Sequence, residues 1–287
     1  MKKMNALRGV WISITAYLLL SIAKLFAGYF LGSEALLADG WNNASDIVAS
    51  VAILIGMKIS LKPRDRNHPY GHSRAETVSS LFASFVMMAI GLQVLFHTAS
   101  ILIQGPKSPP PLSSAWIALL GVLVMSSVYF YNKKLAIKTK SHALMAAAKD
   151  NLSDALVSVG AFIGIIGASL HMYWLDPLTG FIVGLIICKT AFGIFKESSL
   201  MLTDGFDTDK LNEIQTTIKE IDGVEALVDI KARMAGSSVI VDAIVEVAPD
   251  LNIKEGHFIT DEIEARLEKD YDIRTAHIHI EPGQRSQ

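Results

Sequence analysis

Polar side chains that could bind a metal ion interrupt two stretches of the sequence that are otherwise apolar. The segment DGWNNASD, residues 39–46, lies within SEALLADGWNNASDIVASVAILIG, and DNLSD, residues 150–154, lies within a second apolar stretch. Ionised side chains inside a bilayer cost at least about 2.5–3.5 kcal/mol each on insertion scales, so those that occur there are functional by default. These two segments are therefore the first place to look for a functional site.

The spacing within each segment places two ligand-type side chains on one face of a helix. Asn42 and Asp46 are four residues apart, as are Asp150 and Asp154. Three carboxylates and one amide carbonyl form an all-oxygen site, which suits Mn²⁺, with Fe²⁺ or Mg²⁺ next, whereas Zn²⁺ prefers an imidazole or thiolate. Because such ligands bind metal only when deprotonated, metal and protons compete for them, which is the chemistry of an antiporter. Asp39 is interpreted either as an exit-side relay or as a helix-start residue.

The composition of the chain indicates a membrane protein. Hydrophobic residues make up 51% of the 287 residues, and the mean hydropathy is +0.38. Six segments are long and apolar enough to cross a bilayer, at about 10–31, 35–58, 77–104, 114–132, 142–170 and 173–195. Lys24 in the first segment is expected in the bundle interior or reaching toward the membrane surface. The net charge of −2 argues against a nucleic-acid partner.

Basic residues in the short flanks of these segments predict the orientation of the chain. Twelve lysines and arginines flank one set of segment ends, whereas the loops at the other ends contain only Lys107. Positively charged flanks stay in the cytoplasm, so both termini are expected there.

The character of the chain changes after Asp204. Amphipathic helices are predicted over 207–222 and 252–271, and strands over 225–234, 237–248 and 273–282. This αββαβ order suits a small α+β domain with its helices on one sheet face. We therefore expect a six-helix transmembrane domain over residues 1–204 and a cytoplasmic domain over residues 205–287.

The two polar segments also form an internal repeat. Aligning NNASDIVASVAILIG at 42–56 with DNLSDALVSVGAFIG at 150–164 gives seven identities in fifteen positions. The two segments are expected to cross the membrane in opposite directions, a pattern associated with midplane sites in transporters.

Several motifs together resemble the cation diffusion facilitators, which are six-helix, proton-coupled exporters of divalent metals with a ferredoxin-like cytoplasmic domain. The motifs are ASD in the second segment, NHPYGHSRAE after it, DNLSD in the fifth, DPLTGFIVG in the sixth and the αββαβ order of the last domain. The resemblance implies a transport site of Asn42, Asp46, Asp150 and Asp154. Zinc transporters of the family typically carry histidine at the position of Asp150, so this set resembles the manganese-handling branch.

The resemblance also implies residues outside the transport site. Asp65, His68 and His72 match a second metal site in the cytoplasmic loop, although the two histidines suit another metal better than Mn²⁺. Arg74 and Asp204 match an interhelical ion pair that holds the family's dimer together at the membrane surface.

In the last domain, His257, His279 and Glu281 match a regulatory metal cluster of the family. Val228 stands where some relatives have a histidine, so a complete binuclear cluster is not expected. His277 is expected to point to the sheet face opposite to His279. His97 lies in a membrane segment with no partner visible in the sequence and is assigned a packing or hydrogen-bonding role.

The chain is therefore expected to export Mn²⁺ from the cytoplasm in exchange for protons by alternating access, as a homodimer in the plasma membrane. The cargo alternatives are Fe²⁺, Co²⁺ and Zn²⁺, and the functional alternatives are a zinc or iron exporter of the same family and a membrane metal sensor. No prosthetic group is expected. An intramembrane metalloenzyme would need an HExxH-type or nucleophile motif at depth, which the sequence lacks.

Overall fold

The computed structural model describes residues 2–105, 109–139, 142–236 and 238–283. The chain separates into two compact units. The first contains Met1–Ile53 and Phe82–Phe195, and the second contains Leu54–Leu81 and Lys196–Gln287. Each unit is described by itself.

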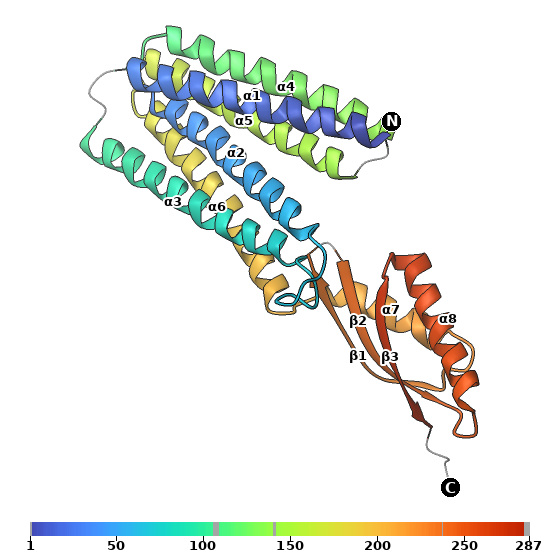
Figure 1. Ribbon diagram of the computed structural model, residues 1–287. Coiled ribbons are helices and arrows are strands. Elements are labelled where there is room, and N and C mark those ends of the chain that lie inside the picture. The colour runs from blue at the N-terminus through green and yellow to red at the C-terminus, as the bar shows by residue number, and fades with distance from the viewer. Residues whose placement is uncertain (1, 106–108, 140–141, 237, 284–287) are drawn as a thin grey trace. The chain divides into compact units, whose positions relative to one another are not determined.

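Six long helices dominate the first unit and extend in part into the second (Figure 1). All six are long and apolar enough to cross a membrane, and no other helix of the described residues is, which confirms the six predicted spans. They are α1 (Lys2–Leu31), α2 (Glu34–Ser60), α3 (Ala75–Gln104), α4 (Ser113–Thr139), α5 (His142–Ser169) and α6 (Leu175–Leu202). Helices α4 and α6 continue several residues beyond their predicted ends, because backbone hydrogen bonding does not stop where hydropathy falls.

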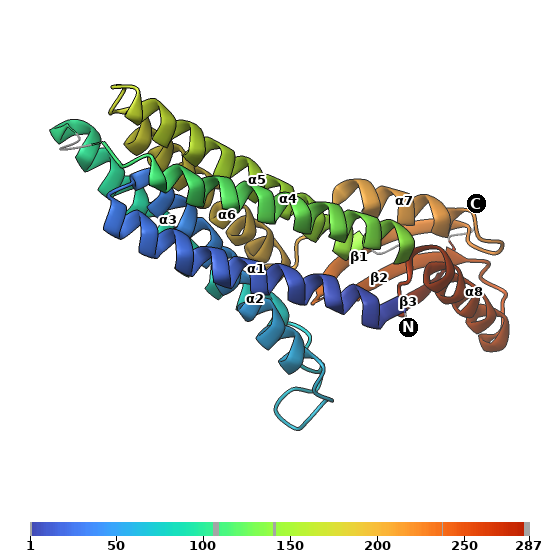
Figure 2. The same ribbon diagram turned by 90° about the horizontal axis from the view of Figure 1, so that it is seen from above.

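Small residues allow the helices of the first unit to approach closely. A Cβ atom on Gly28 of α1 would lie 2.8 Å from the backbone nitrogen of Leu37 on α2, and one on Gly91 of α3 would lie 2.7 Å from Sγ of Cys188 on α6. Helix α4 packs along both α1 and α5 (Figure 2). We call the end of this bundle at which α1 and α5 begin the proximal end, and the end at which α1 ends and α2 begins the distal end.

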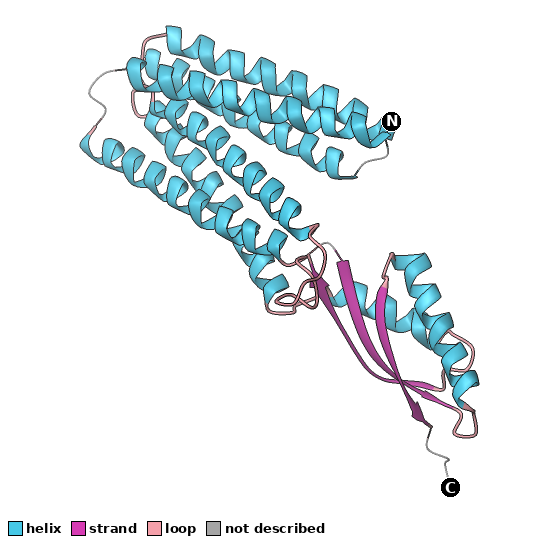
Figure 3. Cartoon of the chain, viewed as in Figure 1, coloured by secondary structure: helices cyan, strands magenta, loops and turns pink. Residues whose placement is uncertain are grey.

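The second unit contains the predicted α+β domain (Figure 3). The sheet has the strand order β1-β2-β3, with β1 antiparallel and β3 parallel to β2. The observed order αββαβ confirms the ferredoxin-like prediction. The elements are α7 (Thr208–Lys219), β1 (Ala226–Ala235), β2 (Ser238–Val247), α8 (Ile253–Tyr271) and β3 (Thr275–Pro282).

Apolar side chains alternate along β2 and mark the face of the sheet that the helices cover. Val241, Ala243 and Val245 are buried and belong to one hydrophobic cluster with Ile218 of α7 and Ile263 of α8. Each helix begins at a capping side chain. Asp207 accepts hydrogen bonds at the start of α7, and Asn252 forms a capping box with Glu255 at the start of α8.

Candidate metal site

Four predicted ligands from two helices line one cavity in the first unit. Asn42 and Asp46 on α2 and Asp150 and Asp154 on α5 all border a cavity of about 380 Å³. The spacing of four residues places each pair on one helix face, and the antiparallel course of α2 and α5 brings the two faces together. The structure therefore brings together the residues that the sequence predicted, although their role as ligands stays a prediction.

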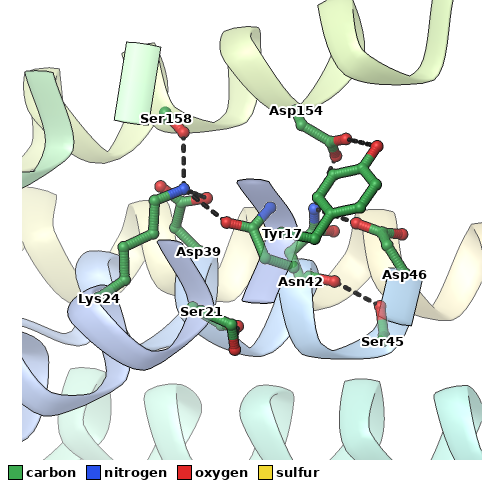
Figure 4. Close-up of polar contacts among 11 residues, drawn as sticks. Tyr17, Ser21, Lys24, Asp39, Asn42, Ser45, Asp46, Asp154 and Ser158 are labelled. Carbon is green, nitrogen blue, oxygen red and sulfur yellow. Dashed lines mark hydrogen bonds and ion pairs between the residues drawn. The ribbon is translucent and has the colours of Figure 1, made fainter. Parts of the chain in front are cut away.

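The amide of Asn42 joins two of the carboxylates. Its Nδ2 donates a hydrogen bond of 2.9 Å to Oδ1 of Asp154 and a longer one of 3.4 Å to Oδ2 of Asp46 (Figure 4). In this arrangement the amide presents its donor, not its carbonyl oxygen, to both acids. To become a metal ligand, the Asn42 side chain has to rotate so that Oδ1 faces the ion.

The cavity exposes its ligands unequally. Asn42 and Asp154 are each 6% exposed, Asp46 is half-buried and Asp150 is exposed. Within the described residues, carboxylate oxygens of the three aspartates do not all lie within 4.8 Å of one another. The cavity continues past Ser50 of α2 and Ala147 of α5, which lie on the proximal side of the ligands. The cavity thus extends from the four predicted ligands toward the proximal end.

Tyr17 of α1 also belongs to this site, and the sequence reasoning missed it. Its hydroxyl donates a 2.8 Å hydrogen bond to Oδ2 of Asp154 and accepts one of 2.8 Å from Nδ2 of Asn151. The other side of the Asn151 amide, Oδ1, accepts hydrogen bonds from Ser13 and Asn132. These two donors fix the orientation of the Asn151 amide, so its Nδ2 group faces the Tyr17 hydroxyl and donates to it. The Tyr17 hydroxyl therefore directs its own proton to Asp154.

An ion pair lies on the distal side of the ligands. Nζ of Lys24 is 2.8 Å from Oδ1 of Asp39, and both side chains are fully buried. The same nitrogen donates to Oγ of Ser158 (Figure 4). It also donates to Oδ1 of Asn43. Of the two interpretations of Lys24, the structure shows the interior one, and it gives Asp39 a cationic partner that the sequence did not reveal.

The predicted loop site lies in the second unit, and its three side chains lie close together. One ligand atom from each of Asp65, His68 and His72 lies within 4.8 Å of the others, the only such group of three among the described residues. The Asp65 carboxylate accepts the backbone N–H groups of His68 and Asn67 at 2.7 and 2.9 Å. The hydrogen bond from the His68 backbone is the main reason why the pKa of Asp65 lies below its usual value. The carboxylate is therefore ionised and turned toward both rings.

Arg74 and Asp204, which the resemblance predicted as an ion pair, do form one. Nη2 of Arg74 lies 2.5 Å from Oδ1 of Asp204. Nη1 of Arg233, on β1, lies 4.0 Å from the other oxygen. The contact joins the residue before α3 to the segment after α6 within one chain.

Among the described residues, the ligand atoms of His257, His279 and Glu281 do not all lie within 4.8 Å of one another. His279 lies 3.7 Å from Glu281, whereas His257 contacts Thr260 at 3.1 Å on α8. The expectation that His277 faces away from His279 was wrong. Both are exposed, and Ile278 between them belongs to the core side. Strand side chains repeat with a period of two, so residues two apart share a face.

His97 has a partner after all. Its Nε2 lies 3.0 Å from Oε2 of Glu34 at the start of α2, near the distal end. The contact agrees with a hydrogen-bonding role for His97.

Comparisons with known proteins cover nearly the whole chain. Residues 10–203 match the cation efflux transmembrane domain, and residues 206–283 match the cation efflux protein cytoplasmic domain. The manganese efflux system protein MneS of Bacillus subtilis (strain 168) is 55% identical over 274 residues, covering 96% of this chain and 94% of that protein. The manganese efflux system protein MneP of the same organism is 30% identical over 280 residues, covering 94% of each.

A solved structure also resembles the α+β domain. The copper form of the MamM CTD is 22% identical, covers 27% of this chain and 76% of that chain, and has a TM-score of 0.26.

Proposed function

Because this chain belongs to the cation efflux family, whose members are metal transporters, we propose that it exports Mn²⁺ from the cytoplasm in exchange for protons by alternating access. The observation that carries the proposal is the cavity lined by Asn42, Asp46, Asp150 and Asp154 within the membrane-spanning bundle. The names of MneS and MneP add support for manganese as the cargo.

The choice of Mn²⁺ over Zn²⁺ follows from the donor atoms. The four residues offer carboxylate and amide oxygens, with no imidazole or thiolate among them. Oxygen donors suit a hard cation such as Mn²⁺, whereas Zn²⁺ gains most from nitrogen and sulfur donors. A zinc or iron exporter of the same family is the alternative cargo assignment.

Proton exchange follows from competition for the same carboxylates. Three carboxylates line one cavity, those of Asp46, Asp150 and Asp154. When ionised, their negative charges have to be neutralised by a divalent ion or by protons. Protons arriving from outside would release the metal there, and cytoplasmic metal would displace protons on the other side. This competition would couple the export of metal to the entry of protons.

Alternating access requires the cavity to open to one side at a time. The cavity extends toward the proximal end, which the basic flanking residues predict to be cytoplasmic. In the proposed mechanism, metal enters the cavity from the cytoplasm at the proximal end. A plasma-membrane location with both termini inside the cell is part of the same proposal.

The other predicted residues have accessory roles in this proposal. Asp65, His68 and His72 form a second metal site in the cytoplasmic loop, and Arg74 with Asp204 stabilises the membrane surface of a homodimer. His257, His279 and Glu281 are proposed as part of a regulatory metal site in the α+β domain.

The proposal is tested by metal flux in proteoliposomes with a pH gradient. Asp46→Ala and Asp154→Ala should each abolish Mn²⁺ uptake, while Asp250→Ala, an exposed acid in the other unit, should leave it unchanged. Unchanged flux in both cavity variants would refute the site. Wild-type protein that binds Mn²⁺ without moving it would instead favour a membrane metal sensor.

A further inference from the structure

The Lys24 ammonium occupies a closed cage of oxygen atoms. Its three partners are Oδ1 of Asp39 at 2.8 Å, Oδ1 of Asn43 at 2.8 Å and Oγ of Ser158 at 3.0 Å. Lys24, Asp39, Asn43 and Ser158 are each 1% exposed or less. Lysine is almost never fully buried unless it is paired, and Lys24 is paired with Asp39.

The cage repeats the ligand arrangement of the proposed transport site. On α2, Asp39 and Asn43 are four residues apart, as are Asn42 and Asp46. On α5, Ser158 follows Asp154 by four residues, so the two layers are separated by about 6 Å, just over one helical turn. One oxygen-rich layer lines the open cavity, and the next holds a tethered cation.

Four helices seal the cage on the distal side of the cavity. A Cβ atom on Gly121 of α4 would lie 2.8 Å from Cε of Lys24 and 3.1 Å from Oγ of Ser158, so α4 lies directly against the cage. Ser21 of α1 donates to the backbone oxygen of Gly40 on α2, which fastens these two helices beside it. Within the described residues, the cavity lining includes none of the cage residues. The cavity therefore ends at this layer.

The closed cage leaves two polar atoms without partners. Oδ2 of Asp39 and Nδ2 of Asn43 are buried and have no hydrogen-bond partner among the described residues. An unsatisfied buried polar atom opposes the arrangement that buries it, and an incomplete ion pair separates more readily than a saturated one. The contacts of Lys24 within the cage can therefore break and re-form.

We propose that Lys24 is the distal gate of the transporter: its ammonium fills the cage of Asp39, Asn43 and Ser158 and leaves it when metal passes outward. The inference rests on the proposed transport site, but the gate can be tested without transport. A divalent ion in the ligand layer repels an ammonium one helical turn away, so loading the site favours opening of the gate. The cage then offers the departing metal a second set of oxygen atoms.

The test measures access to the ligand layer from each side of the membrane. Val157 lines the cavity and is 6% exposed, so Val157→Cys in a Cys188→Ser background provides a single reporter thiol. A membrane-impermeant thiol reagent is added to reconstituted vesicles from the proximal or the distal side. With Lys24 in place and no metal, labelling should occur from the proximal side only.

Removing the gate should allow labelling from both sides. Lys24→Met combined with Asp39→Asn removes both charges and leaves no unpaired buried ion, which protects folding. We expect its labelling rate from the distal side to rise about tenfold or more, which corresponds to ~1.4 kcal/mol in the closed–open equilibrium. Lys189→Met, which removes an exposed lysine from α6, is the matched control and should leave labelling one-sided.

The proposal would be refuted if the folded double variant were labelled from the distal side as slowly as its background. The single variant Lys24→Met provides a second measurement, because distal labelling should rise there as well if the protein folds. Adding Mn²⁺ to the intact background should accelerate distal labelling. If Mn²⁺ has no effect but the double variant labels from both sides, the gate stands and the cargo assignment fails.

Discussion

Replacing Tyr17 with phenylalanine tests whether its hydroxyl holds Asp154 in position. The change removes one oxygen atom and two hydrogen bonds, the 2.8 Å donation to Asp154 and the 2.8 Å acceptance from Asn151. Asp154 then keeps only the Asn42 amide as a side-chain donor among the described residues. The Nδ2 group of Asn151 loses its acceptor in a buried position.

The magnitude follows from these two losses. A hydrogen bond to a charged group contributes about 1.5–3 kcal/mol, and a buried donor without a partner costs about 1–3 kcal/mol. Because neighbouring contributions are not additive, we expect the free energy of unfolding to fall by about 2–4 kcal/mol. A carboxylate held by one donor instead of two is also less well oriented for metal. We expect the Kd for Mn²⁺ to rise about tenfold, which is ~1.4 kcal/mol.

The assay compares Tyr17→Phe with Tyr29→Phe in detergent. Tyr29 lies on the same helix, is 75% exposed and has no side-chain hydrogen bond among the described residues, so it controls for the chemical change itself. Unfolding is followed by denaturant titration and Mn²⁺ affinity by calorimetry. Equal stability and equal Kd in the two variants would refute the reasoning. A loss of stability with an unchanged Kd would assign Tyr17 to packing alone.

Three further predictions address cargo, packing and the loop. Asp150→His should shift selectivity from Mn²⁺ toward Zn²⁺ in a competition flux assay, because it adds an imidazole donor, and unchanged selectivity would contradict the ligand argument. Gly28→Ala should lower the unfolding temperature because the added Cβ meets backbone, whereas Gly193→Ala, with nothing within 4 Å, should raise stability by about 0.5–1 kcal/mol. Because hydrogen bonding lowers the pKa of Asp65 below 3.8, its contribution to loop structure is present above pH 3.8 and is lost as pH falls through the lower value. A carboxyl titration by NMR with a midpoint at or above 3.8 would contradict this.

The six spans and the αββαβ order were predictable because they depend on properties that run along the chain. Hydropathy marks each span, and the alternation around Ala243 marks the buried strand. The four-residue spacing also predicted that Asn42 and Asp46 share a face. The orientation of the Asn42 amide was not predictable, because it is set by Asp154 on another helix.

The partners of Lys24 and Tyr17 were not predictable for a related reason. Each side chain meets residues from helices whose relative rotation and depth are not encoded in hydropathy. The sequence shows that a lysine and a tyrosine lie within a predicted span. It does not show whether each side chain contacts an acid or lipid. The error over His277 was different, since the two-residue period of a strand already predicted the correct face.

Helix α2 carries the ligand layer and the cage layer within two turns. Residues 39–46 are continuous helix, so Asp39 and Asn43 cannot turn away from Lys24 unless Asn42 and Asp46 turn with them. A rotation of α2 that moves the cage residues therefore also reorients the ligand residues. This covalent continuity couples the two layers mechanically, so a movement of α2 at one layer is transmitted to the other.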